Sequence, residues 1–477
     1  MIRRKDGRAS DTSTAKGGVF KPDPKLVDDG GDTPRLGLWA AGAGTLVVIV
    51  VAIVFLLGGD DNASVDLGWL KGDASGDIVY CSGEDVSGSQ HRSVEDFNSS
   101  SEADQAEARL VDNFASSPTA EGQRREYLDR IDKAQCDVVY LDVIYMAEFA
   151  SKGLLRDMSD YLDSRDGAEI FDDRMMKTVS YDDALWGVPK QLDGGVIFYR
   201  NDAEERPESW QDILARARPK PGQKPGLRLQ LDAYEGLTVV FLELAFSAGA
   251  EPIVSEDGKT ANVDQAQAMA ALRFMRDAIR TQAVPGSVTR LGDAGSFYVF
   301  SSGRARFLRS WPYVQPRFLR EAQLAAARGN ATAPARYKTA RNLGVVPLPP
   351  WQAGGPSIGV LGGHNLVIPR SSKNPEAALR LVDFLTSSEQ ILRDARTASL
   401  APVLSDAWRD PEIQANPALS AVNDMELRLR PVLPTYAQVS EAIYTTLRRV
   451  LRTQQSDASL EQALKNIDDD VQAVLDG

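Results

Sequence analysis

An uncharged apolar run near the amino end constrains this 477-residue chain more than any other feature. It extends from Leu36 to Leu57. At about 1.5 Å per residue, a helix of that length reaches roughly 33 Å and crosses a bilayer core about 30 Å thick. The length and the all-round apolarity argue against a buried helix of a globular core. We therefore interpret the run as a membrane-spanning helix.

Two other interpretations compete with a permanent span. A cleaved secretory signal usually has an apolar core of about 7–15 residues, which is shorter than this run. A lipoprotein signal ends in a cysteine that takes the lipid, and Asp60 holds that position here. Eight basic residues precede the run, and the first one after it is Lys71. The positive-inside rule then places residues 1–35 in the cytoplasm and everything after Asp60 outside the cell.

The composition limits the classes of partner and cofactor. A net charge of −13 argues against a nucleic-acid partner, because phosphate binding needs basic patches. The chain has only two histidines, His91 and His364, and two cysteines, Cys81 and Cys136, and none has zinc-site spacing. We expect no cofactor and no metal. On the outer side of the membrane a disulfide can persist, which favours a Cys81–Cys136 bridge. Two buried free thiols are the alternative.

The remainder of the chain alternates strand-like and helix-like segments. Residues 1–35 are polar and read as a disordered tail, 36–57 as the transmembrane helix and 58–76 as an extracellular tether. The outer part exceeds 400 residues, which is more than one ordinary core supports, so two lobes are expected. The first outer segments follow a β-α-β-α order, which predicts an α/β fold with a mostly parallel sheet covered by helices.

The ordered series of outer segments resembles a known family. Its members are the extracellular solute-binding proteins of carbohydrate ABC importers, of the maltose- and trehalose-binding type. The resemblance is carried, in family order, by DVVYLDVIYMAEFASKGLLRDMSDYL, LWGVPKQLDGGVIFYRND, FLELAFSAGAEPIVSEDGKTANVD, FSSGRARFLRSWPYV and LGGHNLVIPRSSKNPEAALRLVDFLTSSEQ. It implies the two-lobed periplasmic-binding-protein-like fold (type II) with hinge crossovers. Lobe 1 would hold 77–190 and 364–400, and lobe 2 would hold 191–363 and 401–477.

The resemblance and the positions of the polar and aromatic residues together predict a ligand site in the cleft. The candidates follow strands, precede a helix or lie in irregular segments, and they are Glu84, Asp85, Asp142, Tyr145, Asp193, Tyr234, Glu235, Trp311, Tyr313, Gly363, His364 and Asn365. Carboxylates accept hydrogen bonds from sugar hydroxyls, and aromatic rings cover sugar faces. Ordinary structural roles compete: Asp142 as a helix N-cap, Glu235 as a first-turn acid and Trp311 as core.

The function implied is binding of a neutral oligosaccharide, such as trehalose or a maltose-like α-glucoside, and delivery to ABC permease subunits. Neutrality rests on the candidates Glu84, Asp85, Asp142 and Glu235, whose carboxylates repel an anion, and on the lack of a basic cluster among the candidates. We expect no enzyme. The GPSIG stretch at 355–359 fits a hydrolase nucleophile elbow, but no helical pattern follows it. A membrane-bound sugar sensor or co-receptor and, below it, a glycoside hydrolase remain the alternatives.

Overall fold

The computed structural model describes residues 76–477 except 101–105, 113–118, 165–169, 288–290 and 454–455. The apolar run Leu36–Leu57, the tail before it and nearly all of the tether lie outside the described residues. Within the described part, no helix combines the length and apolarity that a bilayer crossing requires. The membrane-spanning helix at 36–57 therefore stays a prediction.

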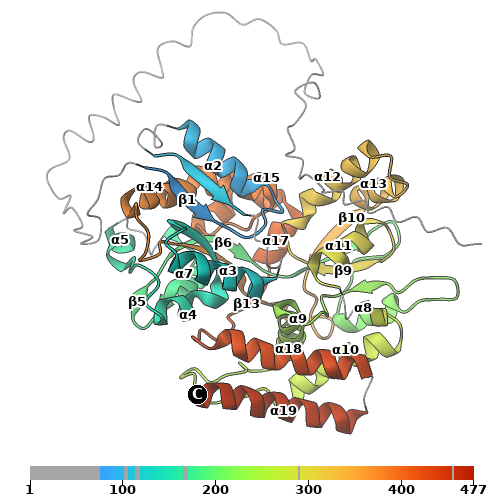
Figure 1. Ribbon diagram of the computed structural model, residues 1–477. Coiled ribbons are helices and arrows are strands. Elements are labelled where there is room, and N and C mark those ends of the chain that lie inside the picture. The colour runs from blue at the N-terminus through green and yellow to red at the C-terminus, as the bar shows by residue number, and fades with distance from the viewer. Residues whose placement is uncertain (1–75, 101–105, 113–118, 165–169, 288–290, 454–455) are drawn as a thin grey trace, which may run out of the picture. The chain divides into compact units, whose positions relative to one another are not determined.

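The first lobe is built on a five-stranded sheet (Figure 1). In spatial order its strands are β2 (Ala108–Val111), β1 (Ile78–Cys81), β3 (Val138–Asp142), β12 (Gly362–Val367) and β6 (Val188–Asp193). Its helical segments are α2 (Ser89–Ser99), α3 (Ala120–Asp132), η3 (Val143–Tyr145), α4 (Met146–Ser151), α5 (Ser159–Ser164), α7 (Asp173–Val179), α14 (Pro375–Leu385) and α15 (Ser388–Ala398). The short strands β4 (Ser180–Tyr181) and β5 (Ala184–Leu185) form a small hairpin.

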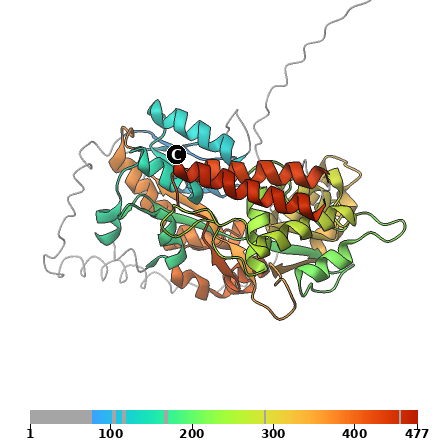
Figure 2. The same ribbon diagram turned by 90° about the horizontal axis from the view of Figure 1, so that it is seen from below.

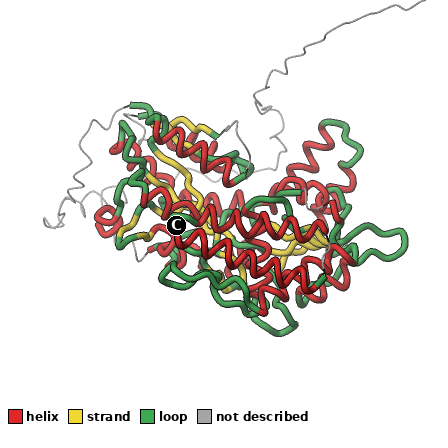
Figure 3. Tube along the Cα trace, turned by 60° about the horizontal axis from the view of Figure 1, so that its bottom comes forward, coloured by secondary structure: helices red, strands yellow, loops and turns green. Residues whose placement is uncertain are grey.

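The second lobe has its own four-stranded sheet. Its spatial order is β10 (Leu343–Pro347), β7 (Val196–Arg200), β9 (Phe307–Ser310) and β8 (Leu227–Arg228). The helices of this lobe are α8 (Trp210–Ala217), α9 (Glu235–Ser247), α10 (Ala266–Arg280), α11 (Asp293–Ser301), α12 (Val314–Ala327), α13 (Ala333–Arg341), α18 (Tyr436–Thr453) and α19 (Asp457–Asp476). In both lobes the strands lie inside and the helices cover them (Figure 3).

The sheets are less parallel than the element order predicted. In the first sheet β1 runs parallel to β2 and β3, but β12 runs antiparallel to both of its neighbours. In the second sheet only β8 and β9 are parallel. The local β-α-β-α pattern governs only the strands that it connects. Strand β12 returns from more than 200 residues downstream, and no short-range rule fixes its direction.

Several segments link the lobes or pack beside the links. The chain passes from β6 to β7 through Gly194 and Gly195, and β11 (Ile358–Val360) pairs with β13 (Glu426–Arg428). The chain between α15 and β13 forms η5 (Ser405–Arg409), α16 (Pro411–Ala415) and α17 (Pro417–Asn423); η5 and α16 pack against α15, and α17 packs against β10 and β7. Helices α18 and α19 then lie side by side and pack against α9 and α10 (Figure 2). The carboxyl-terminal helix pair thus belongs with the second lobe.

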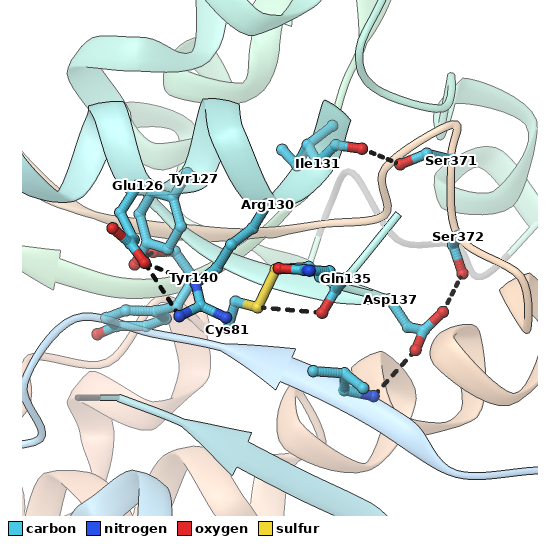
Figure 4. Close-up of a disulfide and its surroundings, with 12 residues drawn as sticks. Cys81, Glu126, Tyr127, Arg130, Ile131, Gln135, Asp137, Tyr140, Ser371 and Ser372 are labelled. Atoms are coloured by element: carbon cyan, nitrogen blue, oxygen red, sulfur yellow. Dashed lines mark hydrogen bonds and ion pairs between the residues drawn. A yellow bond between two sulfur atoms is a disulfide. The ribbon is translucent and has the colours of Figure 1, made fainter. Parts of the chain in front are cut away.

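Cys81 at the end of β1 and Cys136 just before β3 form a disulfide (Figure 4). Their Cα atoms lie 5.8 Å apart, within the usual range for a bridge. The neighbouring Asp137 connects β1 to the segment before α14. Its carboxylate accepts from the Val79 N–H at 3.0 Å and from the Ser372 hydroxyl at 2.7 Å. The disulfide therefore fastens β1 to the segment entering β3, beside the strand ends that lead to the cleft.

We expect the disulfide to contribute substantially to the stability of the first lobe. It closes a loop with a sequence separation of 55 residues, which corresponds to roughly 4 kcal/mol in the loop-entropy model. The Cys81→Ala/Cys136→Ala variant should unfold at lower guanidinium concentration than the oxidised protein. Adding reductant should shift the midpoint of the native sequence and leave that of the variant unchanged. Equal midpoints for the oxidised protein and the variant would contradict this expectation.

Candidate functional site

A cavity of about 640 Å³ lies between the two lobes. Its first-lobe wall is formed by the loop after β1, the start of α3 and the facing ends of β3 and β12. Its second-lobe wall is formed by the amino ends of α9 and α11 and by the segment from β9 into α12. The lining includes Ser82–Ser87, Gln90, Thr119, Ala120, Gln123, Tyr140, Asp142, Gln191, Asp193, Asp232–Gly236, Gly292–Gly295, Tyr298, Trp311, Tyr313, Arg317, Gly362, Gly363, His364 and Arg430.

Ten of the twelve predicted ligand residues line this cavity. They are Glu84, Asp85, Asp142, Asp193, Tyr234, Glu235, Trp311, Tyr313, Gly363 and His364. They come from segments that are up to 280 residues apart in the chain, at the edges of the two sheets that face one another. The cleft therefore gathers the chemical groups that the sequence pattern singled out.

Tyr145 and Asn365, which the sequence also suggested as ligand residues, do not line the cavity. Tyr145 is buried in the cluster around the disulfide, because the 3-10 turn η3 directs its ring into the first lobe beneath Arg124. Asn365 is fully buried and its amide donates to the Thr178 hydroxyl at 3.1 Å. Neighbouring residues of a strand point to opposite faces of the sheet. With His364 in the cleft, Asn365 points into the lobe.

The sheet register places three polar side chains next to one another on the first-lobe wall. His364 on β12 lies opposite Asp142 on β3 and opposite Gln191 on β6. The imidazole stacks on Tyr140, with ring centroids 4.1 Å apart and planes inclined by 5°. Tyr140 also donates its hydroxyl to the Gln191 side chain. This wall therefore combines a flat aromatic pair with carboxylate and amide groups.

The Nδ1 atom of His364 is buried and has no partner among the described residues. Desolvation lowers the pKa of the imidazole, Asp142 opposes that shift and Arg430 adds to it. The ring is therefore neutral near pH 7 and carries one donor and one acceptor nitrogen. A buried polar atom without a partner is costly, so a hydroxyl brought by a ligand would satisfy it.

The second-lobe wall contributes most of the aromatic surface. Trp311 lies over Arg309, with 4.0 Å between the guanidinium carbon and the ring centroid. Arg309 is fully buried and paired with Glu243. Tyr234 donates its hydroxyl to Asp293 at 2.5 Å, and burial raises the pKa of that carboxyl. The indole is thus supported from behind, and its remaining surface is turned to the cavity.

The carboxylates of the cleft do not all have the same role. Asp85 is committed to its own loop, where it accepts from the Ser87 hydroxyl at 2.9 Å and from the Gly88 and His91 N–H groups at 2.7 and 3.0 Å. Glu84 is exposed beside it. Asp142 accepts from the Ile144 N–H at 3.1 Å, so it acts as the N-cap of η3 while still lining the cavity.

Glu235 is not available to a ligand in the way the sequence suggested. Its carboxylate accepts from Arg430 at 2.7 Å, from the Tyr436 hydroxyl at 2.8 Å and from the Ser440 hydroxyl. Burial raises the pKa of Glu235, while Arg430 opposes the shift. The sequence argument for neutrality counted the Glu235 carboxylate as a repelling charge and found no basic cluster among the candidates. The structure corrects that point, because Arg430 lines the cavity and neutralises Glu235.

Several lining residues were not among the predicted ligand residues. A signal existed for Tyr140, because it stands two positions before Asp142 on one strand and so shares its face. No signal pointed to Arg430, Asp293 or Tyr298, which lie outside the segments that carried the resemblance or inside helices of ordinary composition. The GPSIG segment continues into strand β11 instead of a helix, which removes the geometry of a nucleophile elbow.

Asp193 at the end of β6 gives a pH-dependent test of this geometry. Burial is the main cause that raises its pKa from 3.8 to about 8, although the Gly194 N–H donates to it. A carboxyl with a raised folded-state pKa favours folding below its unfolded pKa and loses that contribution as the pH rises through the folded pKa. Relative to Asp193→Asn, the native protein should therefore lose stability between about pH 4 and pH 8.

Guanidinium unfolding of both proteins between pH 4.5 and 9 measures this difference. The free energy of unfolding of Asp193→Asn should exceed that of the native protein by an amount that grows with pH and levels off above the folded-state pKa. Parallel pH profiles for the two proteins would show that Asp193 ionises normally.

Comparison with known proteins places this chain among binding proteins. The family model described as bacterial extracellular solute-binding protein matches residues 113–391. A probable ABC transporter-binding protein of Deinococcus radiodurans is 30% identical over 286 residues, which is 56% of this chain and 64% of the relative. The match thus spans slightly less than two thirds of that relative's length.

Solved structures show the same fold. The maltose-bound MalE3 protein of T. maritima superimposes with a TM-score of 0.71 and 26% identity, covering 84% of this chain and all of that one. The GacH receptor of Streptomyces glaucescens, solved without ligand and with acarbose, has a TM-score of 0.68 and 22% identity, covering 84% of this chain and 99% of that one. The two-lobed α/β architecture expected from the sequence is therefore confirmed.

Proposed function

This chain belongs to the bacterial extracellular solute-binding proteins, and from that premise we propose that it binds a neutral oligosaccharide in the cleft between its lobes and delivers it to an ABC permease. The ligand class that we propose is an α-glucoside such as trehalose or a maltose-like sugar. Support comes from the structural likeness to MalE3, which was solved with maltose, at 26% identity.

The observation that carries the proposal is the set of side chains that line the cavity between the lobes. Aromatic rings stand on both walls, with Trp311, Tyr313 and Tyr234 facing Tyr140 and His364. Carboxylates also line the cavity: Glu84 is exposed there, and Asp142 lies 4.0 Å from Arg430 and uses one oxygen to cap η3. Sugar rings present apolar faces and hydroxyl edges, and a pocket with apolar walls and a few placed acceptors fits both.

The charge balance of the lining argues against anionic ligands. The cavity contains seven carboxyl groups and two guanidinium groups, and Arg430 is consumed by Glu235. Arg317 donates to the Tyr298 hydroxyl at 3.0 Å and lies 4.5 Å from the Phe297 ring centroid, so it is held against its own lobe. Among the described lining residues, an anion would meet carboxylates, and both guanidinium groups are already held by other partners.

We expect Trp311→Ala to weaken sugar binding by about 2 kcal/mol, because truncating a buried aromatic anchor has costs of this order. Isothermal calorimetry with a panel of neutral disaccharides, an amino acid, a peptide and a polyamine measures the ligand class and the loss together. Tyr145→Phe is the matched aromatic control and should bind as the native protein does, because Tyr145 lies outside the cavity.

Binding of a charged ligand without any neutral sugar at millimolar concentration would overturn the carbohydrate proposal. The same incubations distinguish a binding protein from a glycoside hydrolase. A binding protein leaves α- and β-linked disaccharides intact, whereas release of monosaccharide would establish hydrolysis.

We also propose that the segment Leu36–Leu57 anchors the binding domain to the outer face of the cell membrane. The support is the uncharged run and the eight basic residues before it. The full chain should partition with membranes, and amino-terminal sequencing should not begin near Asp60 or Ser64. Recovery of a soluble protein that begins there would replace the anchor with a cleaved signal.

A further inference from the structure

We propose that Arg320 and Glu121 are positioning residues of the ligand cleft, each of which fastens a cleft-lining segment to the opposite lobe. The inference rests on the proposed function for its effect on ligand affinity. Neither side chain lines the cavity. Both bond to backbone groups of segments that do, so they act on the ligand only through the relative position of the two walls.

Arg320 reaches from the second lobe to the first. It stands on α12, whose Phe318 packs against Phe198 of the second-lobe sheet and against Phe297 and Phe300 of α11. Its guanidinium donates to the Val86 carbonyl at 2.5 Å and the Ser87 carbonyl at 3.2 Å. Those carbonyls belong to the loop after β1, on the other side of the cavity.

The loop that receives Arg320 is itself rigidly folded. Asp85 accepts from the Ser87 hydroxyl and from the Gly88 and His91 N–H groups, which closes the turn before α2. Asp85, a predicted ligand residue, therefore holds the shape of its own loop. With the turn fixed, the Val86 and Ser87 carbonyls lie side by side. The two terminal nitrogens of the Arg320 guanidinium can donate to both at once.

Glu121 makes the reciprocal contact from the first lobe to the second. It stands in the first turn of α3, and its carboxylate accepts from the Glu235 N–H at 3.0 Å. Glu235 is the first residue of α9, whose N-cap residue Tyr234 provides no side-chain cap. The free N–H groups and positive end of α9 are thus capped in trans by a carboxylate from the other lobe.

The two contacts have a shared consequence for binding. Each exists only while the lobes are close, and each pins a lining segment that carries candidate ligand groups, Glu84 on one side and Tyr234 on the other. A contact that is made only in one arrangement of two lobes shifts the population toward that arrangement. Such a shift raises ligand affinity by lowering the cost of closure, and it slows ligand release.

The test compares Arg320→Ala with Arg328→Ala, an exposed arginine at the other end of the same helix. With maltose and trehalose as probes, Arg320→Ala should raise the dissociation constant by about threefold to tenfold, chiefly through faster dissociation. Arg328→Ala should leave both quantities unchanged. Arg320 is exposed, so the melting temperature of the ligand-free protein should not fall.

Glu121 offers a conservative rescue. Glu121→Ala removes the acceptor and should raise the dissociation rate, whereas Glu121→Gln keeps an acceptor oxygen and should restore most of the native value. A purely electrostatic effect of the lost charge would make the two variants alike, and that result would overturn the capping role.

Lobe separation is measured without ligand, so the proposal is tested even where no sugar binds. A donor and an acceptor dye on E95C and R280C, exposed positions of the first and second lobes, report the closed fraction. Arg320→Ala should lower that fraction and Arg328→Ala should not. Equal closed fractions in the two variants would overturn this inference while leaving the proposed function intact. Failure of the native protein to bind any sugar would instead overturn the proposed function alone.

Discussion

The junction between the lobes depends on a buried ion pair. Oε1 of Glu235, at the start of α9, lies 2.7 Å from Nη1 of Arg430, after β13. The same carboxylate accepts from the Tyr436 and Ser440 hydroxyls of α18. Arg430 also donates to the Leu361 carbonyl at 3.2 Å, next to the first-lobe strand β12. Removing one member of such a buried pair costs about 3–5 kcal/mol, because the other charge remains without a partner. This ion pair thus joins α9, helix α18 and the segment that leads from β11 into β12.

This constraint sorts the acidic groups of the cleft into two sets. Glu235, Asp85, Asp232 and Asp293 are held by internal hydrogen bonds or ion pairs that shape the walls. Glu84, Asp142 and Asp193 retain acceptor or donor capacity toward the cavity. The net acidity of the lining therefore overstates the charge that a ligand would meet. A neutral, hydroxyl-rich ligand fits the remaining groups without requiring a compensating ion in the site.

The sequence located cavity-lining residues where local pattern determines position. Asp142, Asp193 and His364 stand at the ends of apolar runs, and strand ends in a two-lobed α/β fold meet at the cleft. It failed where neighbouring residues compete for one face: the strand alternation after His364 turns Asn365 inward, and the turn η3 buries Tyr145. It also missed Arg430, because its partner Glu235 is almost 200 residues away and no local pattern encodes that pairing.

The link between β6 and β7 and the Trp311 ring both pack against Arg309. A Cβ atom at Gly195, in the link between β6 and β7, would overlap the Glu243 carboxylate and the Arg309 guanidinium. The same Arg309 lies under Trp311. The link therefore packs directly on the ion pair that holds the indole, and a dihedral change at the link acts on the ring across a single layer of atoms. The Gly194–Gly195 link and the cavity-lining Trp311 ring are thus connected through Arg309, and close-packed interiors transmit small displacements.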